Sequence, residues 1–208
     1  MTVGIESART DTLRAARRAL AEAEKFGDNF GIVCGLWSYA ILTLRLRPGS
    51  ADAAQKMLQR ALTIVDRYRT ATITAAPIKA DIAYLMGRGG DLDGAIDLIR
   101  DELGQQFEDS NFTFVGATAT VLVQLLAARG TDEDVAEGVM LTDALGAVAE
   151  QTQLAALENC VLLNRCVLAR QSGDEAGYRL ALTARSQVRT RLVANGEFLL
   201  LEGLTEIT

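Results

Sequence analysis

The 208-residue sequence predicts an all-α fold, a right-handed α-solenoid of tandem antiparallel helix hairpins. Three observations predict it. Residues that favour helix dominate, Pro48 and Pro77 are the only prolines, and one twelve-residue pattern recurs four times at a constant step of 41 residues. Aromatic residues make up 5% of the chain, which argues against a β-sandwich. We expect a single helical-repeat domain over residues 1–208.

The repeated pattern marks the joint between the two helices of each hairpin. Every copy begins with an arginine, continues through turn-forming residues to an acid in the sixth position, and ends in an apolar pair. The helix dipole favours a cation at the carboxyl end of a helix and an anion at the amino end, each by about 0.3–1 kcal/mol. The apolar pair is expected to face the partner helix. The four joints are residues 47–58, 88–99, 129–140 and 170–181.

Each repeat is therefore one hairpin, with a first helix before the joint and a second helix after it. Pro77 is expected in the first turn of its helix, unless the helix starts later or kinks there, because proline has no N–H to donate inside a helix. Residues 8–26 resemble a second helix without its partner, and residues 197–208 a first helix that is cut short. These ends predict either a piece of a longer protein or a homodimer formed through the terminal helices. The first helices are expected near 28–47, 72–88, 110–129 and 152–170, and the second helices near 50–69, 91–107, 131–150 and 174–194.

The second joint contains the stretch RGGDLDGA, Arg88 to Ala95, which also invites a chemical interpretation. Its two glycines suggest a phosphate loop and its acids a cation site. A phosphate loop needs a lysine followed by serine or threonine, which is missing here. A calcium loop that began at Asp91 would need a glycine in its sixth position, and the glycine comes too early, at Gly94. The other three joints have the same layout, so the stretch is interpreted as a turn between helices.

Composition excludes several kinds of chemistry. The chain has no histidine, which excludes Ser-His-Asp and Cys-His catalysis and histidine metal ligands. Cys34, Cys160 and Cys166 lie in apolar helical segments without CxxC spacing, so we expect buried free thiols in a reducing cytoplasm and no metal. Carboxylate pairs fall at expected helix ends without an evident pocket. We therefore expect no enzyme activity and no cofactor.

The net charge of −6 is distributed unevenly. Residues 91–150 hold two arginines and thirteen acids, a balance that would repel nucleic acid and anionic membranes. The sequence has no run of eighteen apolar residues and no apolar signal core, so we expect no membrane segment. We expect a cytoplasmic location. The arginine-rich segment 178–196 suits an acidic partner, although a solvated face is the simpler interpretation.

Tandem hairpins with a small residue early in the second helix resemble tetratricopeptide repeats, whose period is about 34 residues. The step here is longer, the closing proline is missing, and only Trp37 and Phe112 lie near the family's aromatic position, so the resemblance is to divergent arrays. The segment LAEAEKFGDNFGIVCGLWSYAIL (20–42) is similar to the C-terminal helical arrays of large bacterial regulators. Those regulators join an ATPase module to a DNA-binding domain or a nucleotide cyclase, so the resemblance implies a sensing or docking array.

We therefore expect a non-catalytic scaffold that binds a protein or peptide, as the regulatory segment of a bacterial signalling or transcriptional regulator. The alternative is a sensor domain that holds a small-molecule effector between first helices, and an enzyme is a third hypothesis. No direct contact with nucleic acid is expected. In a solenoid the ligand lies along the concave face, which the first helices line. The polar and aromatic residues expected on that face are Tyr39, Arg45, Tyr84, Asn111, Asn164 and Arg165.

Overall fold

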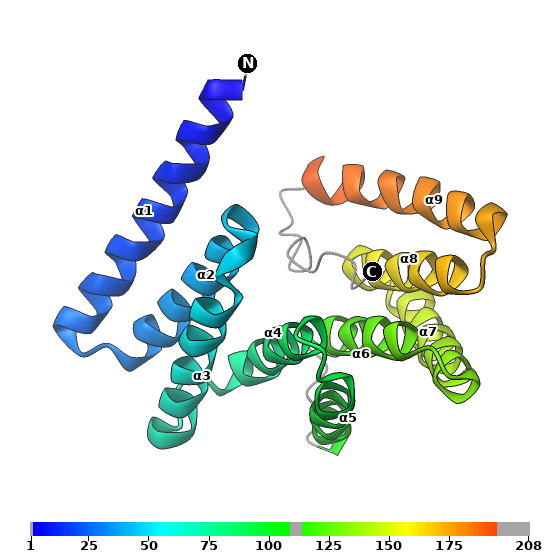
Figure 1. Cartoon of the computed structure of the whole chain (residues 1–208), viewed down its shortest axis with the longest axis horizontal. Coiled ribbons are helices and arrows are strands. Elements are labelled where there is room, and N and C mark those ends of the chain that lie inside the picture. Colours follow the sequence, from blue (N-terminus) through cyan, green and yellow to red (C-terminus); the bar gives the residue numbers. More distant parts are fainter. Residues whose placement is uncertain (1, 109–113, 195–208) are drawn as a thin grey trace. The chain divides into compact units, whose positions relative to one another are not determined.

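A computed structural model describes residues 2–108 and 114–194, and its regular structure there is entirely helical (Figure 1). Each of the nine helices expected in this part of the chain is present. The helix expected at 197–208 lies outside the described residues. The helices are α1 (Thr2–Phe26), α2 (Asn29–Leu46), α3 (Ala51–Tyr68), α4 (Ala75–Arg88), α5 (Leu92–Glu108), α6 (Val115–Arg129), α7 (Asp132–Thr152), α8 (Ala155–Gln171) and α9 (Glu175–Ala194), with 3-10 turns at Pro48–Ser50 and Thr72–Thr74.

The four joints occupy the positions that the 41-residue step predicts. Arg88 and Arg129 are the last residues of their helices, Arg170 lies in the last turn of α8, and Arg47 follows α2 directly. Pro77 is the third residue of α4, in its first turn as predicted. The sixth-position acid of every joint lies in the first turn of the second helix, where the helix dipole favours it; these acids are Asp52, Asp93, Asp134 and Glu175.

The RGGDLDGA stretch is a turn and a helix cap. Gly90 has a φ of 95°, in the left-handed region that glycine adopts without strain. The backbone N–H of Gly94 donates to Asp91 Oδ1 at 3.1 Å, so the Asp91 side chain caps the amino end of α5. The third joint is built similarly, with Gly130 at a φ of 73° and a capping box between Thr131 and Asp134.

The chain divides into two compact units, Met1–Leu85 and Met86–Thr208, and each is described by itself. In the first unit α2 packs against both α1 and α3. Its core includes Val33 and Leu36 from α2, and Ala54 and Leu58 from α3, each at most 1% exposed. Consecutive helices of this unit therefore cover each other's apolar faces, as helical hairpins do.

Helix α2 is long and apolar enough to cross a membrane by length and composition alone. The core helix of a folded unit meets the same criterion, so the finding is weak support for a membrane span. Five α2 side chains are buried within the first unit, and Trp37 Nε1 donates a hydrogen bond to Asp81 Oδ2 at 2.7 Å. Those contacts are typical of a core helix.

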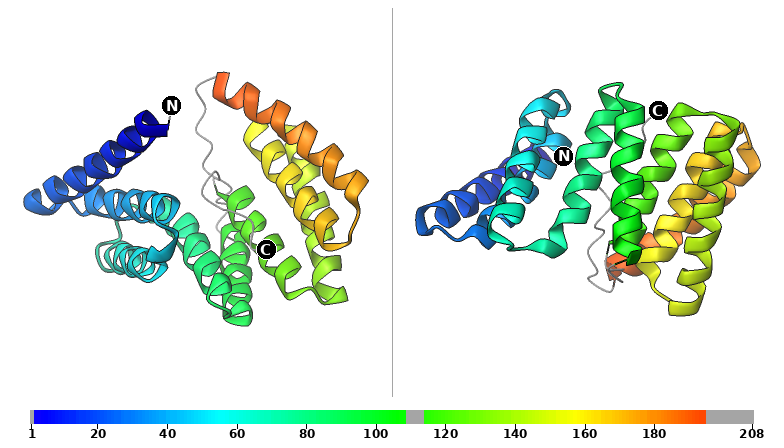
Figure 2. Two further views of the ribbon diagram at one scale, coloured as in Figure 1. Left: turned by 45° about the horizontal axis from the view of Figure 1, so that its top comes forward. Right: turned by 90° about the horizontal axis from the view of Figure 1, so that it is seen from below.

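In the second unit each helix packs against its chain neighbour, and α6 also packs against α8 (Figure 2). Nearly every residue of α6 from Val115 to Ala127 is buried, which makes α6 the central helix of this unit. A Cβ at Gly116 would lie 2.7 Å from the Leu157 side chain, so the glycine lets α8 approach α6 closely.

The apolar pairs of the joints follow the prediction in the first two repeats and depart from it in the last two. Leu58 and Ile99 are fully buried, whereas Met140 is 70% and Leu180 is 75% exposed. The prediction that every pair faces its partner helix is therefore wrong for α7 and in part for α9. Helix α7 is rotated about its axis relative to the repeat, and the stripe that it buries is Asp134, Gly138, Thr142, Leu145 and Ala149.

The three cysteines are free thiols. Cys160 and Cys166 are buried as predicted, and burial raises the pKa of the Cys160 thiol to about 12. Cys34 is only partly buried, which corrects the expectation of a third buried thiol.

Candidate functional site

A candidate site of the second unit is a groove along the outer face of α8, between α7 and α9. We call it the α8 groove. Helix α8 packs against both neighbours and forms the floor, while α7 and α9 form the walls. The groove has an apolar half of about 510 Å³ and a polar half of about 350 Å³. Leu162 and Arg165 line both halves and join them.

The groove is long enough for a polypeptide segment. The residues near α8 that line it extend from Leu154 to Ser172. At 1.5 Å of rise per helical residue, that span is roughly 27 Å. A groove of this length fits about five turns of a helix.

The apolar half presents exposed hydrophobic side chains on both walls. Val139 of α7 is 43% exposed and Leu180 of α9 is 75% exposed. Leu168 and Ala169 of α8 lie between them on the floor. Facing apolar side chains that remain in water are a common mark of an interaction surface.

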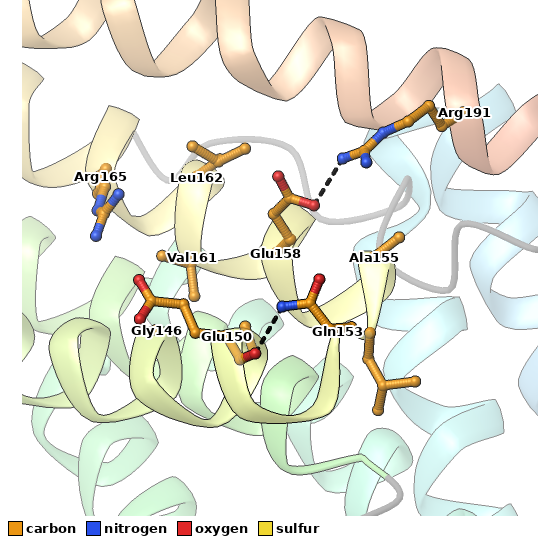
Figure 3. A pocket seen from close by; sticks show the side chains of 11 residues that line it. Gly146, Glu150, Gln153, Ala155, Glu158, Val161, Leu162, Arg165 and Arg191 are labelled. Carbon is orange, nitrogen blue, oxygen red and sulfur yellow. Dashed lines mark hydrogen bonds and ion pairs between the residues drawn. The ribbon is translucent and has the colours of Figure 1, made fainter.

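The polar half contains charged side chains at the other end of α8 (Figure 3). Arg191 of α9 and Glu158 of α8 form an ion pair, with Nη2 and Oε2 2.7 Å apart. Gln153 Nε2 donates to the Glu150 backbone oxygen at 2.7 Å and closes the end of α7. This half is therefore more polar than the half around Val139 and Leu180, although Leu154, which is 55% exposed, also lines it.

Arg165 stands where the two halves meet. Its side chain is exposed, and its Nη2 lies 3.9 Å from the position that a Cβ on Gly146 of α7 would occupy. The guanidinium thus extends from α8 across the floor toward α7. Within the described part of the chain Arg165 has no hydrogen bond or ion pair, and neither has Asp143 on the α7 wall. The centre of the groove therefore carries a guanidinium that has no hydrogen-bonded partner among the described residues, with the Asp143 carboxylate on the α7 wall.

The repeat explains why the groove is open here. Two ion pairs bridge the helices of the α5–α6–α7 region: Arg100 Nε of α5 donates to Glu137 Oε1 of α7 at 3.0 Å, and Arg129 Nη1, at the end of α6, donates to Asp93 Oδ1 of α5 at 2.7 Å. The positions one repeat after Arg100 and Glu137 are Leu141 and Tyr178, which carry no charge. The first of these bridges therefore has no counterpart between α7 and α9.

The second bridge is also replaced in the last repeat. Asp134, one repeat after Asp93, is held by Arg129 of its own joint, with Nη2 and Oδ1 2.6 Å apart. This hydrogen bond lowers the pKa of Asp134 to about 2 and raises the pKa of Arg129. Arg170, one repeat after Arg129, stacks over the Tyr178 ring at 5.4 Å from its centroid.

The structure places the residues expected at a binding face in different surroundings. In the first unit Tyr39 is half-buried, Arg45 is exposed and Tyr84 is 5% exposed in α4. In the second unit Asn164 is fully buried, and its neighbour Arg165 lies in the α8 groove. Asn111 lies outside the described residues. A binding role for these six residues stays a prediction.

Sequence reasoning missed Asp81 of α4. Its half-buried carboxylate accepts the hydrogen bond from Trp37, and burial raises its pKa to about 7, against the lowering effect of that bond and of the Arg45 charge. The available signal was that Asp81 is the only acid in the apolar segment 70–87. Its position next to Trp37 and Arg45 follows from the packing of α2 and α4 and could not be read from the chain.

The fold defines a class: an all-α array of helices that pack mostly with their chain neighbours in antiparallel pairs. No family model, no curated protein and no solved structure matches the chain. The chain therefore belongs to this fold class, and the comparisons show no family for it.

Proposed function

We propose that the chain is a non-catalytic scaffold that binds a polypeptide segment of a partner protein in the α8 groove. One observation carries the proposal: a groove roughly 27 Å long with the exposed apolar side chains of Val139 and Leu180 on opposite walls. Covering such a surface with a partner removes apolar area from water, which is the main favourable term in protein association.

The groove suits a polypeptide better than a small effector. A small-molecule site is typically a concave pocket that buries most of its ligand. The α8 groove instead leaves an apolar side chain exposed on each wall, Val139 on α7 and Leu180 on α9. We further propose, from the resemblance to regulator arrays, that this binding serves the regulatory segment of a cytoplasmic bacterial regulator.

Site-specific photo-crosslinking in the source cell tests the proposal. A photoreactive amino acid is placed at Val139 or at Leu180, and at Gln59 of α3 as an exposed control position in the first unit. We expect the same protein to be crosslinked from both groove positions and not from Gln59. Crosslinks from all three positions alike, or from none, would contradict the proposal.

A pair of α9 variants gives the matched control. Leu180→Asp puts a charge on the groove wall and should abolish the crosslink from Val139. Leu182→Asp changes a leucine on the same helix that is 41% exposed and does not line the groove, and it should leave the crosslink intact. Equal losses in the two variants would show a general effect on α9 and would count against the groove.

A further inference from the structure

We infer that the partner segment is an amphipathic helix whose apolar stripe ends in a carboxylate that pairs with Arg165. This inference rests on the proposed function and specifies the partner's chemistry. It comes from three features of the α8 groove: its helical walls, its division into an apolar and a more polar half, and the guanidinium without a hydrogen-bonded partner among the described residues where the halves meet.

The walls favour a helix over an extended strand. An extended peptide binds tightly when a sheet edge pairs with its backbone N–H and C=O groups. The floor and walls of the α8 groove are the helices α7, α8 and α9, whose interior backbone groups are already hydrogen-bonded within each helix. A strand would lose water from its backbone without finding partners, whereas a helix satisfies its own backbone.

The two halves fix how the helix lies. Its apolar side chains belong against Val139, Leu168 and Leu180, in the apolar half. Arg165 lies three residues, about one turn, before Leu168 on α8. The partner's charged residue must therefore follow the last apolar residue of its stripe by about one turn, in the direction of the polar half.

The charge at the centre selects a carboxylate. A helix laid over α8 removes water from the Arg165 guanidinium, and a charge that loses water without gaining a partner destabilises the complex. A carboxylate restores the lost hydrogen bonds, because its two oxygens match the guanidinium fork. The α7 wall carries the acids Asp143 and Glu150, so the edge of the helix that faces α7 should be basic.

Designed peptides test this chemistry. The probe is a stapled helix of about 18 residues, with leucines along one stripe, a glutamate one turn beyond the last leucine and lysines along one edge. The matched peptide has lysine in place of the glutamate. We expect fluorescence anisotropy of the full chain to show roughly ten-fold or greater preference for the glutamate peptide, from a hydrogen-bonded charge pair.

Charge reversal supplies the control. Arg165→Glu should invert the preference between the two peptides, and Arg17→Glu, an exposed change on α1, should leave it unchanged. Equal binding of both peptides by the unmodified chain, or binding of neither, would overturn the inference. If the crosslinks from Val139 and Leu180 persist in that case, the proposed function stands and only the partner chemistry fails. If they are also missing, both fail.

Discussion

Two neighbouring regions of the second unit share one repeat but differ in how they are closed. In the α5–α6–α7 region one ion pair bridges α5 and α7 and another joins the end of α6 to α5, and Gln124 on the floor is 2% exposed. In the α7–α8–α9 region the equivalent floor residue, Arg165, is exposed and lines a groove. The difference shows that the repeat sets where helices begin and end, while single side chains decide whether the space between them is open.

The stability of the α5–α6–α7 region, which we call the closed region, depends most on Asp134. Its carboxylate is 2% exposed, caps α7 through Thr131 and binds Arg129. Asp134→Ala should lower the free energy of unfolding by about 2–3 kcal/mol, because it removes a cap and leaves the Arg129 guanidinium with the exposed Asp93 as its one carboxylate partner among the described residues. The control is Glu175→Ala, the exposed acid at the same repeat position, which should cost under about 0.5 kcal/mol. Urea unfolding followed by circular dichroism measures both, and equal losses would contradict the comparison.

The pH dependence of stability should separate Asp134 from Asp81, because their pKa values shift in opposite directions. The stabilising contribution of Asp134 is complete above about pH 4 and is lost as the pH falls toward 2. Asp81 keeps its proton in the folded chain up to about pH 7, so its contribution is lost as the pH rises from about 4 to 7.

Asp81→Asn tests the effect of Asp81. In the unmodified chain the free energy of unfolding should decline by about 1–2 kcal/mol as the pH rises, and the variant should not show this decline. The expected value is smaller than the full pKa shift implies, because Asp81 is only half-buried. Urea unfolding near pH 5 and near pH 8, followed by the fluorescence of Trp37, the only tryptophan, measures it. Equal declines in the variant and the unmodified chain would show that Asp81 is not the group responsible.

The α7–α8–α9 region, which we call the open region, should close if it receives an ion pair like the one between Arg100 and Glu137. The double variant Leu141→Arg with Tyr178→Glu gives α7 and α9 the two residue types that form the Arg100–Glu137 pair one repeat earlier. We expect crosslinking from Val139 to fall about ten-fold, because a bridge across the groove competes with the partner. Leu141→Arg alone lacks the acid and should have a smaller effect. Unchanged crosslinking in the double variant would mean that this bridge does not govern the opening.

The exposed bridge of the closed region should matter least for stability. Glu137→Gln removes the ion pair with Arg100, whose side chain is 40% exposed, and should cost about 0.5 kcal/mol. Glu158→Gln in the polar half of the groove breaks a similarly exposed pair with Arg191 and should cost no more. Chemical denaturation of both variants tests this, and a loss above about 1.5 kcal/mol in Glu137→Gln would show that the bridge does more than join two surface charges.

The sequence predicted the helices well because their ends are set locally. The 41-residue step, the arginines and the first-turn acids depend on turn chemistry and the helix dipole, which act within a few residues. The position of Pro77 in the first turn of α4 was also predicted, because proline lacks a backbone N–H donor. These features placed α2 to α9 within a few residues of their observed bounds in the described part of the chain.

The rotation of α7 and the groove could not be predicted in the same way. The repeat treats Val139 and Met140 as equivalents of Leu98 and Ile99, yet α7 buries Asp134 and Gly138 instead. The reason is tertiary: Arg129 holds Asp134 inward, and a Cβ at Gly138 would lie 3.1 Å from Leu168, so the glycine allows close packing there. Arg165 was expected on a ligand-binding face, but no pattern in the chain indicated a groove between α7 and α9.

Arg129 also has a consequence for how the second unit comes apart. Its guanidinium contacts Asp93 of one hairpin and Asp134 of the next, so it connects two successive hairpins at a single point. Opening of either hairpin breaks contacts of the other, and such coupling makes neighbouring repeats unfold together. Amide hydrogen exchange should then give α5 and α7 one shared opening free energy, while α9 opens at a lower one.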